Sequence, residues 1–373
     1  MKKIYRKLSI WIPALLAVAA ALTAAALVRA RFLPDVEVPV LLYERVENTP
    51  TGRYSVSSDL FYAQLRDFSR QGYASVAPWR LPAYKKWGFP LPEKPLLITF
   101  DRACRDLPAV AGQFLDDQKF SATVLLATSL ITNEALNRRM TLEGAEMMTW
   151  EEVRKLNGAG VFTFGGNTRS RADLTLSENP RNEIRASRSD IKKNLGERNN
   201  TFAYPFGKHN AETAKAAKRA KIDIAMTYGN TVAQIGPKTD MLAIPRIRVV
   251  GGRQVFAVEA VESRSREAFG FATVARQSGP AFPARVSVFY GADPQAVAEQ
   301  NVELREAETF KIALPYPASD TIAAMWPMRV EIRDATGVLL YLSVEIKSQS
   351  VIRTPGAGVN ISGEIELDDL KLE

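Results

Sequence analysis

The segment from residue 96 to residue 107, LLITFDRACRDL, places charged side chains directly after an apolar run. Its first five residues do not alternate in polarity, which is typical of a strand buried on both faces. Asp101 and Arg102 follow that strand, and Glu44 follows a second apolar run. Two carboxylates on neighbouring strand ends can serve as acid and base in glycoside cleavage, whereas a guanidinium binds carboxylate or phosphate groups. The sequence therefore predicts a polar site at strand ends.

The elements that position these side chains alternate between strands and helices from about residue 38 to residue 263. Apolar runs predict eight strands, at Val38–Tyr43, Tyr73–Val76, Leu96–Phe100, Ala122–Leu126, Val161–Phe164, Thr201–Tyr204, Asp223–Thr227 and Ile244–Val250. Apolar stripes and capping residues predict helices at Asp59–Gln71, at Trp150–Asn157 and from Asn179-Pro180 to Gly196. This alternation predicts a closed or nearly closed parallel β/α barrel, in which the carboxyl ends of the strands share one crevice.

Two further polar clusters follow strands of this predicted barrel. The segment GGNTRSRADLT contains Asn167 and Arg171, and the segment FAYPFG contains Tyr204 and Phe206. Each cluster alone would be an ordinary solvated turn. Four such clusters at one end of a barrel instead favour a binding site. His209, the only histidine, follows the last cluster, and we expect it to be exposed to solvent.

The pattern changes after about residue 264. Apolar and polar residues alternate at 328–332 and 338–346 around the turn 334–337, which predicts a hairpin with one buried face. We expect an all-β sandwich over residues 264–373. The segment 363–373, GEIELDDLKLE, resembles the last strand of jelly-roll carbohydrate-binding modules, so a carbohydrate-binding role and a generic sandwich both remain open.

The N-terminus accounts for most of the basic excess. The net charge is +8, and residues 1–31 hold six cations and no acid, which leaves only +2 for the rest of the chain and gives no indication of nucleic-acid binding. The apolar run 10–28 is long enough to span a membrane, and the four cations before it predict a cytoplasmic N-terminus. Residues 1–31 are therefore read as a membrane anchor or a cleaved signal peptide, and residues 32–263 as the exported barrel. The single cysteine, Cys104, cannot form an internal disulfide.

Four of these segments also resemble the motifs of one protein family. VPVLLYERV, LLITFDRAC, GGNTRSRADLT and FAYPFG occur in the order found in NodB-type polysaccharide deacetylases, carbohydrate esterase family four. The resemblance covers about residues 38–250 and implies a deacetylase-type barrel. In that family a divalent metal activates the water that attacks the acetamide carbonyl. The resemblance assigns the role of general base to Asp101.

The sequence departs from the family at the metal ligands. Their three positions hold Arg102, Asn167 and Arg171, and an early histidine position holds Glu44. An arginine is always protonated and has no lone pair to give to a metal. Two guanidinium groups would also repel a dication. We therefore expect no metal and no other cofactor. Of the metal-ligand and general-base positions, only the base position, Asp101, is retained.

Three functions follow from these expectations. The first is a membrane-tethered protein in the periplasm or at the cell surface that binds a saccharide in exopolysaccharide synthesis, export or retention, with an acidic saccharide as one option. Its expected binding residues are Arg102, Asn167, Arg171, Tyr204 and Phe206. The second is an active hydrolase, either a deacetylase with an unusual site or a glycosidase that uses Glu44 and Asp101. The third is a structural or interaction protein that contacts envelope or secretion proteins.

Overall fold

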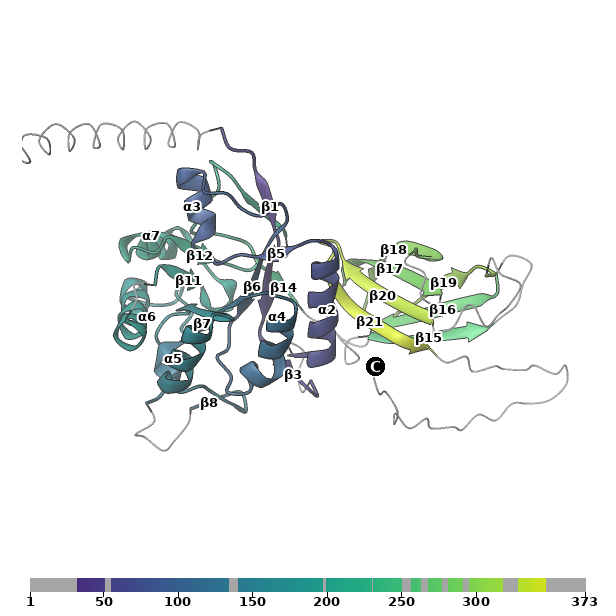
Figure 1. The fold of residues 1–373 in the computed structure, drawn as a ribbon, viewed down its shortest axis with the longest axis horizontal. Helices are drawn as coiled ribbons and strands as arrows, with labels where there is room; N and C mark the ends of the chain where they lie inside the picture. The colour runs from purple at the N-terminus through teal and green to yellow at the C-terminus, as the bar shows by residue number, and fades with distance from the viewer. Residues whose placement is uncertain are drawn as a thin grey trace, which may run out of the picture.

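The computed structural model describes residues 32–50, 55–133, 140–196, 199–229, 231–249, 256–262, 268–276, 281–290, 295–317 and 328–346. It contains a barrel flanked by helices and a β-rich part beside it, with helix α2 between the two (Figure 1). The predicted membrane segment 10–28 and the strand predicted at 364–372 lie outside the described residues. Within the described ranges no helix has the length and apolarity needed to cross a membrane.

Seven parallel strands form the wall of the barrel in the order β12-β11-β10-β7-β6-β2-β14. They are β2 (Val40–Tyr43), β6 (Pro95–Phe100), β7 (Ala122–Leu126), β10 (Phe162–Gly166), β11 (Thr201–Ala203), β12 (Ile224–Met226) and β14 (Ile247–Arg248). Ile244 bridges Met226, and the Thr227 amide donates to the Ile244 carbonyl at 2.8 Å. The segment that leads into β14 therefore links the two ends of the sheet, and the predicted parallel barrel is confirmed.

The strand predicted at Tyr73–Val76 is the eighth strand of this sheet, but it lies off the path of the seven wall strands. β5 (Ala74–Ser75) pairs with the first two residues of β6, whereas β2 pairs with β6 from Leu97 onward. The Val76 amide donates to the Leu96 carbonyl, whereas the Leu97 amide donates to the Pro39 carbonyl, so β5 and β2 lie on opposite edges of β6. The Ser121 amide, directly before β7, donates to the Ser75 hydroxyl at 2.8 Å, which places β5 on the β7 side. The remaining short strands of this part are β1 (Val36–Val38) paired with β13 (Ala233–Ile235), β3 (Arg45–Glu47) paired with β4 (Ser55–Ser57), and β8 (Thr141–Leu142) paired with β9 (Ala145–Glu146).

Helices connect most of the wall strands. They are α2 (Ser58–Arg70), α3 (Arg80–Trp87), the π-helical turn η1 (Pro108–Gly112) leading into α4 (Gln113–Asp117), η2 (Thr128–Leu130), α5 (Trp150–Ala159), α6 (Pro180–Leu195), η4 (Pro205–Gly207) and α7 (Ala211–Arg219). The predicted capping box of α5 is present, with Thr149 and Glu152 each bonded to the other's backbone amide. The predicted limits of α6 are also confirmed, since Asn179 is its N-cap and Gly196 ends it at φ +76°.

The β-rich part consists of two antiparallel sheets. One sheet holds β15 (Phe256–Glu262), β16 (Gly270–Arg276) and β19 (Thr309–Leu314), and the other holds β17 (Phe282–Tyr290), β18 (Ala298–Leu304), β20 (Met328–Asp334) and β21 (Leu339–Ile346). Side chains of both sheets, among them Val274 and Val288, belong to one hydrophobic cluster, as in a sandwich. The predicted hairpin is β20–β21. The domain boundary predicted between residues 263 and 264 stays a prediction. Strand β15 lies before this boundary in the sequence but pairs with β16 of the sandwich.

Helix α2 joins the barrel to the sandwich. Asp67 on α2 receives two hydrogen bonds from Arg333 of β20, at 2.5 and 2.9 Å. Gln64, one turn earlier, donates to the Leu339 carbonyl of β21 and accepts from the Tyr43 hydroxyl of β2 at 2.8 Å. Buried polar side chains therefore connect the strand that carries Glu44 to the second domain.

Candidate functional site

Charged side chains gather at the carboxyl ends of the barrel strands. Asp101 directly follows β6, and Glu44 directly follows β2. Because these strands are parallel neighbours, their carboxyl ends meet at the same edge of the wall. Arg246 and Arg248 come from the segment of β14, and two residues apart on a strand they share a face. The arrangement is a cluster of carboxylates and guanidiniums at the barrel mouth.

Asp101 forms a buried ion pair with Arg246. The two terminal guanidinium nitrogens donate to the two carboxylate oxygens at 2.6 and 2.9 Å. Arg246 has no exposed surface, and Asp101 is 3% exposed. Arg246 also donates to the Thr99 hydroxyl at 3.2 Å and to the Thr227 carbonyl at 3.3 Å. A bidentate pair of this kind fixes the carboxylate in place and offsets its burial.

Glu44 lies among three arginines and a tyrosine. Its Oε1 accepts from Arg248 at 2.7 Å and from the Tyr228 hydroxyl at 3.2 Å. Its Oε2 lies 3.4 Å from Arg102 Nε and 3.5 Å from Arg171 Nη2. The side chain of Glu44 is only 4% exposed. Glu44 therefore holds both arginines that occupy the expected ligand positions.

Burial raises the pKa of Tyr228 to about 12, and the negative charges of Asp101 and Glu44 act in the same direction. The phenol consequently stays protonated at neutral pH and remains a hydrogen-bond donor to Glu44. The Tyr228 ring also lies 4.4 Å from the Arg248 guanidinium. Such stacking adds a cation–π attraction to the ion pair.

A third carboxylate reaches the same arginines from the turn between β8 and β9. Glu143 accepts from Arg102 Nη2 at 2.6 Å and lies 3.8 Å from Arg171 Nη1. Its side chain is 62% exposed, and its φ is +49°. The hydrogen bond from Arg102 lowers the pKa of Glu143 more than partial burial raises it. Glu143 therefore stands as an anion over two arginines that are themselves largely buried.

Arg102 remains charged in this setting. Burial lowers the pKa of Arg102, but the hydrogen bond to Glu143 and the attraction of Glu44 outweigh burial, and the pKa is raised. The described cluster thus contains three carboxylates and four guanidiniums, a surplus of one positive charge. Glu143, Arg246 and Arg248 were not among the expected site residues.

Asn167 and Phe206 take different positions around this cluster. Asn167 is 1% exposed, and among the described residues neither atom of its side-chain amide has a hydrogen-bond partner. Phe206 is 43% exposed, and its ring centroid lies 5.0 Å from the Arg171 guanidinium. Its φ of +58° is uncommon for a residue with a side chain. Phe206 is therefore an exposed aromatic surface beside Arg171.

Tyr204 does not line the groove as we expected. It has no exposed surface and belongs to the hydrophobic cluster that also contains Ile184 of α6 and Ala217 of α7. Its ring packs edge-on against Phe202 at 5.4 Å and stacks on exposed His209, also at 5.4 Å. The side chain points outward from the wall into the helical layer, a direction that the sequence FAYPFG does not reveal.

The donor chemistry of this cluster does not fit a divalent metal. Arginines hold two of the expected ligand positions and offer no lone pair. Asp101 and Glu44 are already bonded to guanidiniums, and Asn167, at the remaining expected ligand position, offers only a neutral amide oxygen. No group of three histidine, cysteine or acidic side chains in the described ranges is arranged to hold a metal ion. The one cysteine, Cys104, is buried, and burial raises the pKa of its thiol to about 11.

Comparison with known proteins gives the family of the barrel. Residues 89–225 match the sequence profile of the family described as polysaccharide deacetylase. The poly-β-1,6-N-acetyl-D-glucosamine N-deacetylase of Staphylococcus aureus (strain MRSA252) is 22% identical over 208 residues, which cover 52% of this chain and 68% of that protein.

Among solved structures, the Streptococcus pyogenes deacetylase PplD in complex with acetate shares the fold. Its TM-score is 0.51 at 23% sequence identity, and the match covers 58% of this chain and 94% of that chain. Glu44, Tyr228, Arg246 and Arg248 lie outside the segment that matches the family profile. Residues 89–225 therefore form a segment of the polysaccharide deacetylase type, and the barrel has the deacetylase fold.

Proposed function

We propose that this chain is a saccharide-binding member of the polysaccharide deacetylase family that does not carry out the metal-dependent reaction. One observation carries the proposal: Arg102 and Arg171 converge on Glu44 and Glu143 where the family resemblance places metal ligands. A carboxylate between two guanidiniums is the arrangement of an anion site. The ligand is a polysaccharide that bears an acidic substituent.

Glu143 marks the place of the ligand's anionic group. Its carboxylate is exposed and comes from a two-residue turn, whereas the arginines beneath it are 7% and 11% exposed. The carboxylate of an incoming uronate would take the place of the Glu143 carboxylate on Arg102 and Arg171. Both buried guanidiniums would therefore keep an anionic partner. Phe206, beside Arg171, offers an aromatic surface for a sugar ring.

A hydrolase that uses Glu44 and Asp101 has less support. A general acid or base must be within hydrogen-bond reach of the group with which it exchanges a proton. Glu44 lies within 3.5 Å of three arginines, and Asp101 has both oxygens bonded to Arg246. All the oxygens of both carboxylates thus lie within 3.5 Å of a guanidinium nitrogen. For this reason we propose that Glu44 and Asp101 hold the arginines of the site in position and do not act as acid and base.

The proposal also places the protein outside the cytoplasm, tethered by residues 10–28, where exopolysaccharide is made, exported or retained. Four cations before that apolar run support this topology. A reporter enzyme that is active only outside the cytoplasm, fused after Glu373, is expected to be active. Activity of a cytoplasmic reporter alone at the same position would refute the orientation.

The absence of metal-dependent catalysis is tested on the full chain purified without chelator. We expect no stoichiometric zinc, cobalt or nickel by elemental analysis and no acetate release from N-acetylglucosamine oligomers. Addition of each metal in excess should not induce acetate release. One tightly bound metal per chain together with acetate release would overturn the proposal.

A further inference from the structure

A second charged site lies on the outside of the barrel. A hollow of about 310 Å³ is lined by Arg185, Arg188, Ser189 and Lys192 of α6, by Asn199 before β11, and by Lys221 before β12. Residues that precede β11 and β12 lie at the amino ends of these strands. The cluster around Asp101 lies at the carboxyl ends, so the hollow is at the opposite end of the barrel wall.

The cations of α6 form a stripe along one helix face. Arg181, Arg185, Arg188 and Lys192 are spaced by four, three and four residues, which places them above one another. Like charges at this spacing destabilise a helix. An anion bound across the stripe would relieve this repulsion.

The acids of α6 are engaged elsewhere. Glu183 accepts from the backbone amides of Arg169 and Ser170 at 3.0 and 2.9 Å. Asp190 accepts from the Thr128 hydroxyl at 2.8 Å and lies 3.5 Å from Arg169 Nε. Both acids therefore face the carboxyl-end loops of the barrel, and no acid lines the hollow in the part of the chain that the structure describes.

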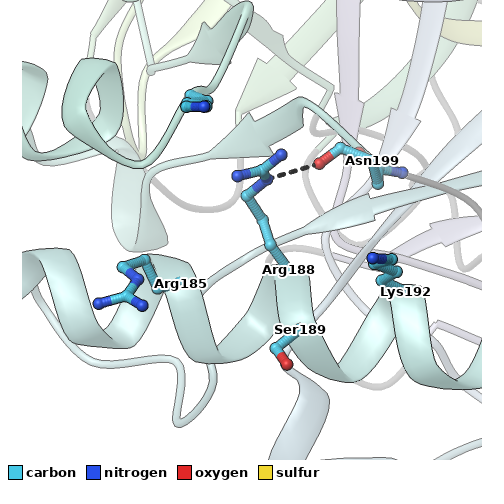
Figure 2. A pocket seen from close by; sticks show the side chains of 6 residues that line it. Arg185, Arg188, Ser189, Lys192 and Asn199 are labelled. Atoms are coloured by element: carbon cyan, nitrogen blue, oxygen red, sulfur yellow. Dashed lines mark hydrogen bonds between the residues drawn. The ribbon is translucent and has the colours of Figure 1, made fainter.

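Arg188 lines the hollow, and hydrogen bonds hold its guanidinium in place. Its Nε donates to the Asn199 carbonyl at 2.9 Å (Figure 2). Its other nitrogens donate to the Ala220 carbonyl and to Asn200 Oδ1. Asn200 in turn binds Asp223 at 2.6 Å, which is the nearest acid in this network. Arg188 thus joins α6 to the segments before β11 and β12.

Three exposed cations line the hollow around Arg188. Arg185 and Lys192 project from α6 on either side of Arg188 (Figure 2), and Lys221 lines the hollow from the turn after α7. None of the three forms an ion pair with another described residue. Their charges are therefore available to a ligand, whereas every arginine of the first site already contacts a carboxylate.

We propose that this hollow binds a phosphate group, either free or as the monoester of a sugar. Three positive charges are balanced best by an anion that carries more than one negative charge, which favours a phosphomonoester over a single carboxylate. Arginine offers a planar fork and lysine a compact charge, and both bind phosphate oxygens. The volume of the hollow is at the lower end of the range of small-molecule sites. This site does not depend on the function proposed for the first site.

The test is calorimetric titration of the full chain with inorganic phosphate and with glucose 6-phosphate, at constant ionic strength, with glucose as the uncharged control. We expect both phosphates, but not glucose, to bind. The double variant Arg185→Glu with Lys192→Glu should weaken binding at least about tenfold, since two charge-assisted contacts are lost. Tighter binding of glucose 6-phosphate would identify a sugar phosphate as the ligand, and equal binding would identify free phosphate.

The matched control is Lys193→Glu, an exposed lysine of the same helix that does not line the hollow. This variant should retain binding within about twofold, because its charge lies outside the site. Absence of phosphate binding to the wild type, or an equal loss in Lys193→Glu and in the double variant, would overturn the proposal.

Discussion

Arg246 donates two hydrogen bonds to Asp101 at the centre of the barrel mouth, and neither side chain is more than 3% exposed. Loss of one partner of such a buried pair leaves an uncompensated charge in a site that excludes water. The family resemblance assigns the role of general base to Asp101. In the structure the Asp101 carboxylate is paired with Arg246, a residue that lies outside the four motif segments.

Replacement of Arg246 by alanine should therefore lower the free energy of unfolding by about 3–5 kcal/mol. Chemical denaturation of both proteins measures the difference. Arg248→Ala, two residues along the same strand, should cost less, because Arg248 is 23% exposed and Glu44 keeps its contacts to Arg102, Arg171 and Tyr228. Equal stability of Arg246→Ala and wild type would show that the pair does not support the barrel.

The contact between α2 and β20 predicts energetic coupling between barrel and sandwich. Burial lowers the pKa of Arg333, but the hydrogen bonds and charge of Asp67 outweigh burial and raise it. A double-mutant cycle with Asp67→Ala and Arg333→Ala should give a coupling energy of about 1–3 kcal/mol. The exposed pair Arg285–Glu299, at 3.9 Å in the sandwich, serves as the matched control and should give less than about 0.5 kcal/mol. Equal coupling in both cycles would contradict a docking role for Asp67.

Local sequence patterns predicted much of this fold. The strand Ala122–Leu126 has the limits predicted for it, and the caps Thr149 and Asn179 begin the helices predicted after them. The predicted turn Asp334–Gly337 joins β20 to β21, and Asp334 accepts from the amides of Thr336 and Val338. Capping and turn residues act within a few positions of the chain, so their effect is readable without the tertiary structure.

The partners of the site residues were not predictable in the same way. Arg246 is 145 residues from Asp101, and Glu143 is 41 residues from Arg102. Such contacts depend on how the barrel closes, which no local pattern encodes. One signal was present: Arg246 and Arg248 alternate with apolar residues in PRIRVV, which is unusual for a buried strand and places both on its inner face. The burial of Tyr204 was not predicted. Tyr204 is the last residue of its predicted strand, directly before a turn, and the sequence there does not indicate which face of the barrel wall its side chain occupies.

Glu143 should compete with anionic ligands for Arg102 and Arg171. Glu143→Gln removes the charge but keeps the shape of the side chain, and affinity for a uronic-acid oligosaccharide should rise about two- to fivefold, as expected for an exposed ion pair. The matched control is Glu146→Gln, which lies in the same hairpin and pairs with Arg105 at 2.9 Å. Calorimetry should show no change for this control. A weaker affinity in Glu143→Gln than in wild type would mean that Glu143 supports binding.

The acid titration of Glu143 should reflect its contact with Arg102. Because its folded-state pKa is lowered, the contact is fully present above the ordinary value of 4.5 and is lost only as the pH falls through the lower, folded value. Carbon-detected NMR of the Glu143 carboxylate should therefore give a midpoint below 4.5. In Arg102→Ala the midpoint should move up. A midpoint at or above the ordinary value in wild type would exclude a stable contact in solution.

The central claim is that Arg102 and Arg171 bind an anionic group of a saccharide. Its most direct test is calorimetric titration of wild type and Arg171→His with a uronic-acid oligosaccharide and its neutral counterpart. Wild type should bind the acidic ligand more tightly, and added salt should weaken that binding. The substitution removes a charge-assisted contact of about 1.5–3 kcal/mol, so affinity for the acidic ligand should fall roughly ten- to more than a hundredfold. Equal binding of both ligands by both proteins, or no binding by wild type, would contradict the claim.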